Sequence, residues 1–135
     1  MIKTYIIGTG YLSNELKKEI VNSEIVSAKS FIKIINLVNK SKEKINLIIN
    51  SFYSSKKLND LYSYKIFIEK SYLEIGEIFD KINPKKIKKI LYTSSSSVYG
   101  SINNKIKILD QNNRYIYSSA KLTCEMLLKN FSNVS

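Results

Sequence analysis

Two residues near the C-terminal end of the sequence have types and a spacing that suit acid/base chemistry. Tyr117 and Lys121, in the stretch YSSAK, are four residues apart, so they share a face if this stretch is helical. A lysine ammonium beside a phenol favours the phenolate, which makes the tyrosine usable as a general acid/base. The same spacing recurs at Tyr53 and Lys57, because both residue types are abundant. Tyr117 differs in its position at the start of a predicted helix, just after a serine-rich strand end.

A glycine turn near the N-terminus, GTGYLS at residues 8–13, is a second candidate site. It follows the apolar run IKTYII and opens a segment with helical spacing. In that context, backbone N–H groups at a helix N-terminus hold a pyrophosphate. Gly8 and Gly10 are two of only four glycines in the chain, and with Tyr11 and Leu12 they form the predicted phosphate-binding turn. Ser13 stands where the dinucleotide-binding fingerprint has its third glycine.

The choice between NAD and NADP depends on the end of the second predicted strand. Sites that prefer NAD place a carboxylate there, to hydrogen-bond the adenosine ribose. This chain has Ser27, Ala28, Lys29 and Ser30 instead. Lys29 and its serine neighbours could hold the 2'-phosphate of NADP, but lysine is frequent throughout the chain, so both cofactors stay open.

The elements that position these residues alternate along the sequence. Short apolar runs predict strands at 2–7, 24–28, 45–50 and 86–93, and apolar spacing predicts helices at 11–21, 31–40, 58–82 and 115–131. On the last helix, Ala120, Cys124, Leu127 and Leu128 are expected to lie on a common side. The alternation predicts an α/β fold, a Rossmann-like open parallel sheet with a central first strand and helices on both faces. Ligands of such sheets bind beyond the carboxyl ends of the strands, where the winding reverses.

The composition indicates one hydrophobic core, so we treat residues 1–135 as a single domain. No run approaches the ~20 apolar residues that span a bilayer, and the first residues lack the apolar segment of a signal peptide, so we expect a cytoplasmic protein without a membrane partner. The single cysteine, Cys124, cannot form an internal disulfide. The absence of histidine excludes the common zinc-ligand sets and histidine-based catalysis.

The net charge of +11 is the main argument for a nucleic-acid partner, because phosphate binding uses clustered lysine and arginine. The lysines are spread along the whole sequence, however, and Arg114 is the only arginine. With the accompanying abundance of isoleucine and asparagine, this distribution is typical of an AT-rich genome. We therefore do not expect nucleic acid as the partner, and we predict that the densest run, PKKIKK at 84–89, is a solvated lead-in to a strand.

Three motifs together, GTGYLS, LYTSSSSVYG and YSSAKLTCE, resemble in their order and spacing the extended short-chain dehydrogenase/reductases, which include nucleotide-sugar epimerases, dehydratases and reductases. The resemblance covers essentially the whole chain and implies an NAD(P)-binding Rossmann-like domain. It implies that Ser95 hydrogen-bonds the reacting oxygen of the substrate and that Tyr117 is the acid/base. Lys121 would bind the nicotinamide ribose and favour the tyrosinate. The implied reaction is hydride transfer between a sugar carbon and nicotinamide.

The sequence also departs from this family. Where the family has small alanines beside the cofactor, this sequence has Asn50, Ser51 and Phe52. The resemblance therefore implies that Asn50 and Ser51 belong to the cofactor site and that Phe52 would crowd the cofactor. There is room for only one helix between the second and third predicted strands, so one family strand is shortened or missing. Family members are much longer, and the missing half includes the substrate-binding region, so the predicted domain is truncated relative to the family.

Two functional hypotheses follow. In the first, the chain is an NAD(P)-dependent nucleotide-sugar epimerase, dehydratase or reductase, and a homo-oligomer or a partner chain supplies the missing half. The alternative is a non-catalytic dinucleotide-binding or interaction module, or the remnant of a longer enzyme. Cofactor binding separates both from a nucleic-acid-binding protein, and turnover that depends on Tyr117 separates the first from the second.

Overall fold

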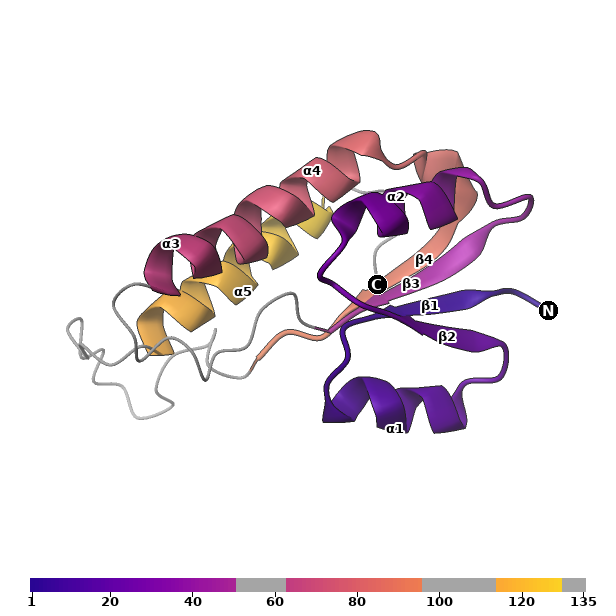
Figure 1. Ribbon diagram of the computed structural model, residues 1–135, viewed down its shortest axis with the longest axis horizontal. Helices are drawn as coiled ribbons and strands as arrows, with labels where there is room; N and C mark the ends of the chain where they lie inside the picture. The colour runs from indigo at the N-terminus through magenta and orange to yellow at the C-terminus, as the bar shows by residue number, and fades with distance from the viewer. Residues whose placement is uncertain (51–62, 96–113, 130–135) are drawn as a thin grey trace.

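Four short apolar runs form one parallel sheet, as the sequence predicts. The strands are β1 (Thr4–Ile7), β2 (Ser23–Val26), β3 (Ile45–Ile49) and β4 (Ile87–Tyr92), in the order β2-β1-β3-β4. The computed structural model describes residues 1–50, 63–95 and 114–129 (Figure 1). All neighbouring strands pair in parallel. β1 has a neighbour on either side, which confirms the predicted central position of the first strand.

Helices connect the strands and follow the last one. They are α1 (Tyr11–Glu19), α2 (Phe31–Asn39), α3 (Ser63–Ile68), α4 (Glu74–Lys81) and α5 (Arg114–Lys129). A π-helical turn, Glu69–Leu73, joins α3 to α4, and a 3-10 turn, Pro84–Lys86, leads into β4. In the described ranges, no helix is both long and apolar enough to span a membrane.

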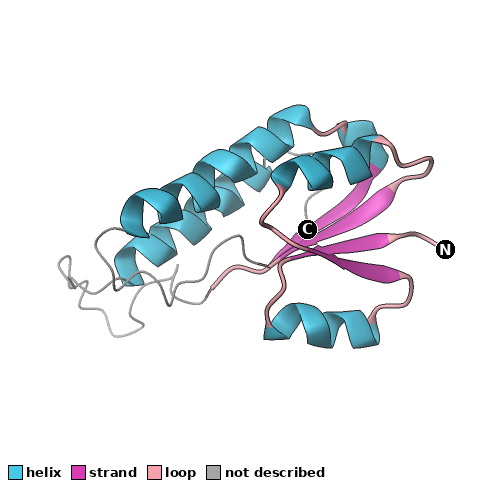
Figure 2. Ribbon diagram, in the orientation of Figure 1, coloured by secondary structure: helices cyan, strands magenta, loops and turns pink. Residues whose placement is uncertain are grey.

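The direction of winding reverses at β1. The chain passes from β1 through α1 to β2, and then back through α2 to β3 on the other side of β1. Because parallel crossovers are right-handed, this reversal puts α1 and α2 on opposite faces. Figures 1 and 2 show α1 on one face, and α2, α3, α4 and α5 on the other. The protein therefore has an α/β Rossmann-like fold with helices on both faces of an open parallel sheet.

The main hydrophobic core lies between the sheet and the face that carries α2, α4 and α5. Alternate residues of each strand enter it, as the pleat requires. The core includes Ile7, Val26, Leu47, Ile49 and Ile90 from the strands and Ile34, Val38, Ile75, Ile78, Cys124 and Leu128 from the helices. The single α2 between β2 and β3 confirms that there is room for only one helix there, and it leaves β2 as an edge strand.

The last two predicted helices differ in detail from those observed. Leu127, predicted on the same side of α5 as Ala120, Cys124 and Leu128, is 37% exposed, because the buried side of the helix runs through the other three at intervals of four. The predicted helix at 58–82 is helical over 63–81 but contains the π-helical turn, and 58–62 lie outside the described residues. The Cys124 thiol donates a hydrogen bond to the Ser71 carbonyl in that turn, at 3.2 Å. The wider turn is thus part of the packing of α5 against its neighbour.

Candidate functional site

The glycine turn at the end of β1 contains one glycine that the backbone requires and one that it does not. Gly8 is buried and has a φ of 118°, a conformation that L side chains rarely adopt. Gly10 has an ordinary extended conformation as the N-cap of α1. A Cβ added at Gly10 would meet no atom within 4 Å. The fold alone therefore does not require glycine at position 10, whereas a ligand that approaches the backbone there would.

The N-terminus of α1 suits an anion. Its first turn contains no acidic residue, and its N-cap makes no side-chain hydrogen bond. The first backbone N–H groups of a helix lack intrahelical partners and carry a partial positive charge. Tyr11 is 81% exposed and Leu12 47% exposed, so these two predicted site residues flank the turn at the surface. The turn lies at the point where the winding of the sheet reverses.

Ser13, at the third-glycine position, is buried and hydrogen-bonded to Asn50. The Asn50 side-chain amide donates to the Ser13 hydroxyl at 2.7 Å, and the Asn50 backbone N–H donates to the Ile7 carbonyl at 3.1 Å. Asn50 therefore joins the end of β3 to the start of α1. Its side-chain oxygen Oδ1 is buried and has no hydrogen-bond partner among the residues that the structure describes. Two positions that depart from the family pattern thus form one contact.

Lys121 ties α5 to the ends of β3 and β4. Its ammonium donates to the Asn50 carbonyl at 2.9 Å and to the Thr93 carbonyl at 2.8 Å. The side chain is 8% exposed, and Nζ lies 4.7 Å from the centroid of the Tyr92 ring. Burial lowers the pKa of Lys121, and the nearby Cys124 acts in the opposite direction. The two carbonyls and the aromatic ring keep this buried cation partnered.

Tyr117 lies one helical turn before Lys121 on the same side of α5. Nζ of Lys121 is 5.8 Å from the centroid of the Tyr117 ring. Tyr117 is half-buried and packs against the small cluster of Phe67 and Ala120, with Tyr72 beside it. The predicted pair is therefore brought together at the carboxyl edge of the sheet, with the Lys121 ammonium between the tyrosine and the strand ends.

The remaining predicted site residues lie at the same edge of the sheet or outside the described residues. Ser95 is half-buried and follows β4 by three residues. Lys29 is exposed beyond the end of β2, where its backbone N–H donates to the Ser27 hydroxyl at 3.2 Å. Ser51 and Phe52 lie outside the described residues. Hydrogen bonds and a cation–ring contact thus join Ser13, Asn50, Lys121 and Tyr117. Gly8, Gly10, Lys29 and Ser95 lie at neighbouring strand ends.

Sequence reasoning missed Tyr92 and Thr93, which line the floor of this site. The Thr93 hydroxyl donates to the carbonyls of Ile49 and Asn50, at 3.3 and 3.1 Å. Burial raises the pKa of Tyr92 far above its usual value, and the adjacent Cys124 adds to the shift, so its phenol stays neutral. The available signal was strand alternation, since Tyr92 falls on the same face as Ile90, toward α5.

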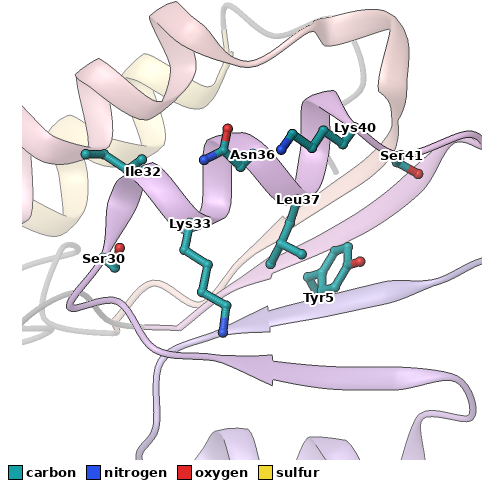
Figure 3. A pocket seen from close by; sticks show the side chains of 8 residues that line it. All are labelled: Tyr5, Ser30, Ile32, Lys33, Asn36, Leu37, Lys40 and Ser41. Carbon is teal, nitrogen blue, oxygen red and sulfur yellow. The ribbon is translucent and has the colours of Figure 1, made fainter.

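A separate cavity of about 550 Å³ lies beside α2 (Figure 3). In Figure 3, Leu37 and Lys33 extend from α2 toward the sheet, where Tyr5 of β1 forms part of the wall. Among the described residues that line this cavity there is no carboxylate, and Ser30, a serine neighbour of Lys29, is the one residue there that the sequence analysis considered for cofactor binding. Its lining residues are Tyr5, Ser30, Ile32, Lys33, Asn36, Leu37, Lys40 and Ser41.

No protein-family model matches the chain, and no curated protein matches it either. What the fold and the site define is therefore a class of structure, an α/β Rossmann-like fold with a polar site at the carboxyl edge of its parallel sheet.

Proposed function

We propose that the chain binds NAD or NADP at the carboxyl edge of the sheet, with the pyrophosphate at the turn between Gly8 and Ser13. The observation that carries this proposal is the open space at Gly10, where nothing in the protein lies within 4 Å of an added Cβ. The uncapped N-terminus of α1 beside it supplies the N–H groups that an anion needs. Lys29, exposed at the end of β2, is placed to meet the adenosine ribose or its 2'-phosphate.

As a catalyst, the chain would act as a nucleotide-sugar epimerase, dehydratase or reductase. The bound nicotinamide would supply hydride chemistry at a sugar carbon. Tyr117 would exchange a proton with the sugar hydroxyl, and Ser95 would hydrogen-bond the same oxygen. The Lys121 ammonium would lie beside this exchange, because its Nζ is 5.8 Å from the centroid of the Tyr117 ring. An ammonium has three protons, and the Asn50 and Thr93 carbonyls use two, so one can serve the tyrosine or the ribose.

The proposal includes a partner that supplies the substrate-binding region, as a second copy or another chain. Large apolar side chains are exposed on β4 and α5, among them Leu91, Leu122 and Met126. Exposed apolar groups of this kind are common at interaction surfaces. A cytoplasmic location is also part of the proposal, because Cys124 is a free, buried thiol, as is usual in a reducing compartment.

One observation favours the non-catalytic alternative, a dinucleotide-binding or interaction module. The Lys121 ammonium already has a structural role, since it bridges the ends of β3 and β4. This structural role explains the presence of Lys121 without any catalytic role for the neighbouring Tyr117.

The proposal is tested by isothermal titration calorimetry of the purified chain with NADH and with NADPH. Saturable binding of either cofactor is expected, and Gly10→Val should abolish it while lowering stability only by the loss of a favourable N-cap, about 1 kcal/mol. Absence of binding at millimolar concentrations of both cofactors would overturn it. Binding together with cofactor-dependent conversion of a nucleotide sugar supports the enzyme, and binding without conversion in the presence of a substrate-binding partner supports the module.

A further inference from the structure

Lysines that are dispersed along the sequence gather at the amino edge of the sheet. Because all strands are parallel, the segments that lead into them meet at one edge, on the right in Figure 1. Residues 40–44 lead into β3, and residues 82–89 lead into and begin β4, the neighbouring strand. Together these two segments, which we call the basic edge, contain one acidic residue, Glu43, and seven lysines: Lys40, Lys42, Lys44, Lys85, Lys86, Lys88 and Lys89.

The basic edge holds most of the charge of the protein. Seven lysines and one glutamate give a net charge of +6, in a chain whose total is +11. All seven lysines are exposed except Lys86, which is half-buried. None of the seven takes part in any ion pair found among the described residues. The charge is therefore not neutralised by the part of the chain that the structure describes.

Hydrogen bonds fix the two segments to each other. The Asn39 side chain donates to the Lys81 carbonyl at 2.9 Å and accepts from the Asn83 backbone N–H at 2.7 Å. The Asn83 side chain in turn accepts from the Lys85 backbone N–H at 3.0 Å and caps the 3-10 turn at Pro84. The lysines thus project from a preorganised backbone, which lowers the entropic cost of binding.

The fold itself gives no reason for this cluster. The macrodipoles of α2 and α4 favour a cation at each C-terminus, which accounts for Lys40 and Lys81. Lys85, Lys88 and Lys89 lie beyond the reach of these helix ends, because the effect is confined to the last turn. Like charges gathered on one surface repel each other and lower stability. A bound polyanion would relieve this repulsion, which would contribute to the affinity.

The chemistry of the basic edge favours nucleic acid over a membrane or a hydrophobic protein interface. Its two isoleucines, Ile82 and Ile87, are 4% and 1% exposed, so the basic edge offers no large apolar side chain for insertion into lipid or for an interface core. The side chains of Asn39 and Asn83 are engaged in the hydrogen bonds described above, so they are not free to recognise base edges. Lysine ammonium groups alone recognise phosphate as a point charge.

We propose that the basic edge binds the phosphate backbone of nucleic acid without sequence preference. The sequence-based argument against nucleic acid relied on the spread of lysines along the chain. In the folded protein, the parallel topology brings seven of these lysines together at one edge of the sheet. The basic edge lies at the opposite end of the strands from the Gly10 and Tyr117 site, so this proposal is independent of cofactor binding.

The test is the fluorescence anisotropy of labelled duplex DNA and single-stranded RNA of mixed sequence, titrated with the protein at several salt concentrations. The test variant is Lys42→Gln/Lys44→Gln/Lys85→Gln/Lys86→Gln. The matched control makes the same change of net charge at four exposed lysines elsewhere, Lys17→Gln/Lys33→Gln/Lys65→Gln/Lys129→Gln. All eight positions are at the surface or half-buried, so neither variant is expected to unfold below the wild-type temperature. NADH binding provides a separate readout of the other edge.

We expect wild-type dissociation constants on the order of 10⁻⁴ to 10⁻⁶ M at physiological salt. The test variant should weaken binding at least tenfold and reduce the slope of log K against log salt for duplex DNA by about 3 to 4, while the control variant changes neither strongly. Equal losses in both variants, no binding by the wild type, or equally strong binding to polyglutamate or to anionic vesicles would each overturn the proposal.

Discussion

The side-chain amide of Asn50 donates a 2.7 Å hydrogen bond to the hydroxyl of Ser13, and both groups are buried. This contact fixes the position of the first turn of α1 relative to the end of β3. The third glycine of a dinucleotide-binding turn lets helix and strand pack closely. Here a serine occupies that position, and the asparagine from the next strand provides its partner. The turn is therefore held by a polar contact.

The Ser13–Asn50 pair should show energetic coupling. Ser13→Ala leaves the Asn50 amide buried without an acceptor, which should cost about 1–3 kcal/mol in the free energy of unfolding. Asn50→Ala should cost a similar amount, but the double variant should cost less than the sum, with a coupling of about 0.5–3 kcal/mol. Urea unfolding of the four proteins measures this cycle. Strictly additive losses would show that the hydrogen bond contributes nothing to stability.

The two glycines of the turn should respond differently to alanine. Gly8→Ala forces an L side chain to a φ of 118° and should destabilise the fold by about 1–3 kcal/mol. Gly10→Ala has room for its Cβ and should cost no more than about 1 kcal/mol, because alanine is a poorer N-cap than glycine. If a phosphate approaches position 10, the same variant should weaken cofactor binding at least tenfold. Chemical unfolding and cofactor titration of both variants separate the two roles, and unchanged cofactor affinity in Gly10→Ala would contradict a pyrophosphate at this turn.

The strands were predictable from the sequence because buried parallel strands are nearly continuous apolar runs. INLII of β3 is an example, and its position after a strand and a helix already implies a parallel crossover. Periodicity does not fix how a helix is rotated against the strand ends, however. Leu12 fits the apolar spacing of α1 and is 47% exposed, whereas Ser13 is its buried residue. The π-helical turn at Glu69–Leu73 likewise results from packing against α5.

The part of the candidate site that lies on one helix was predictable from residue type and spacing. Tyr117 and Lys121 are adjacent on α5 as their spacing indicates. The carbonyl partners of Lys121 could not be predicted, because they belong to residues 28 and 71 positions away in the sequence, Thr93 and Asn50. The basic edge was missed for the same reason, since lysines that are far apart along the chain become neighbours only once the strands pair. Contacts of this kind depend on the topology of the sheet.

Lys121 should make stability depend on pH in a defined direction. Burial holds its pKa in the folded protein below its ordinary value of 10.5, so the unfolded chain binds more protons in the interval between the two values. The free energy of unfolding therefore gains a term that increases as the pH rises through the lowered pKa toward 10.5. Lys121→Met removes this term, and also leaves the carbonyls of Asn50 and Thr93 without their donor, at a cost of about 1.5–3 kcal/mol.

The measurement for Lys121 is urea unfolding of wild type and Lys121→Met between neutral and alkaline pH. The difference in stability, wild type minus variant, should grow with pH. Lys129→Met is the matched control, because Lys129 is exposed on the same helix, and it should behave like the wild type. A difference that shrinks as the pH rises would mean that the folded protein raises the pKa of Lys121.

Tyr117 should be required for turnover and dispensable for cofactor binding, if the chain is the proposed enzyme. Tyr117→Phe removes the proton-exchanging hydroxyl but keeps the ring that packs near Phe67 and Ala120. The free energy of unfolding should therefore stay close to that of wild type, and the affinity for NADH should stay within about twofold. The rate of cofactor-dependent nucleotide-sugar conversion should fall by a factor of about 10² to 10⁴, the usual contribution of a general acid/base. Tyr72→Phe is the matched control, because Tyr72 is half-buried in the same cluster, on the π-helical turn, and it should retain activity. Equal activity of Tyr117→Phe and wild type would remove Tyr117 from the reaction, and equal losses in the two variants would assign the effect to packing.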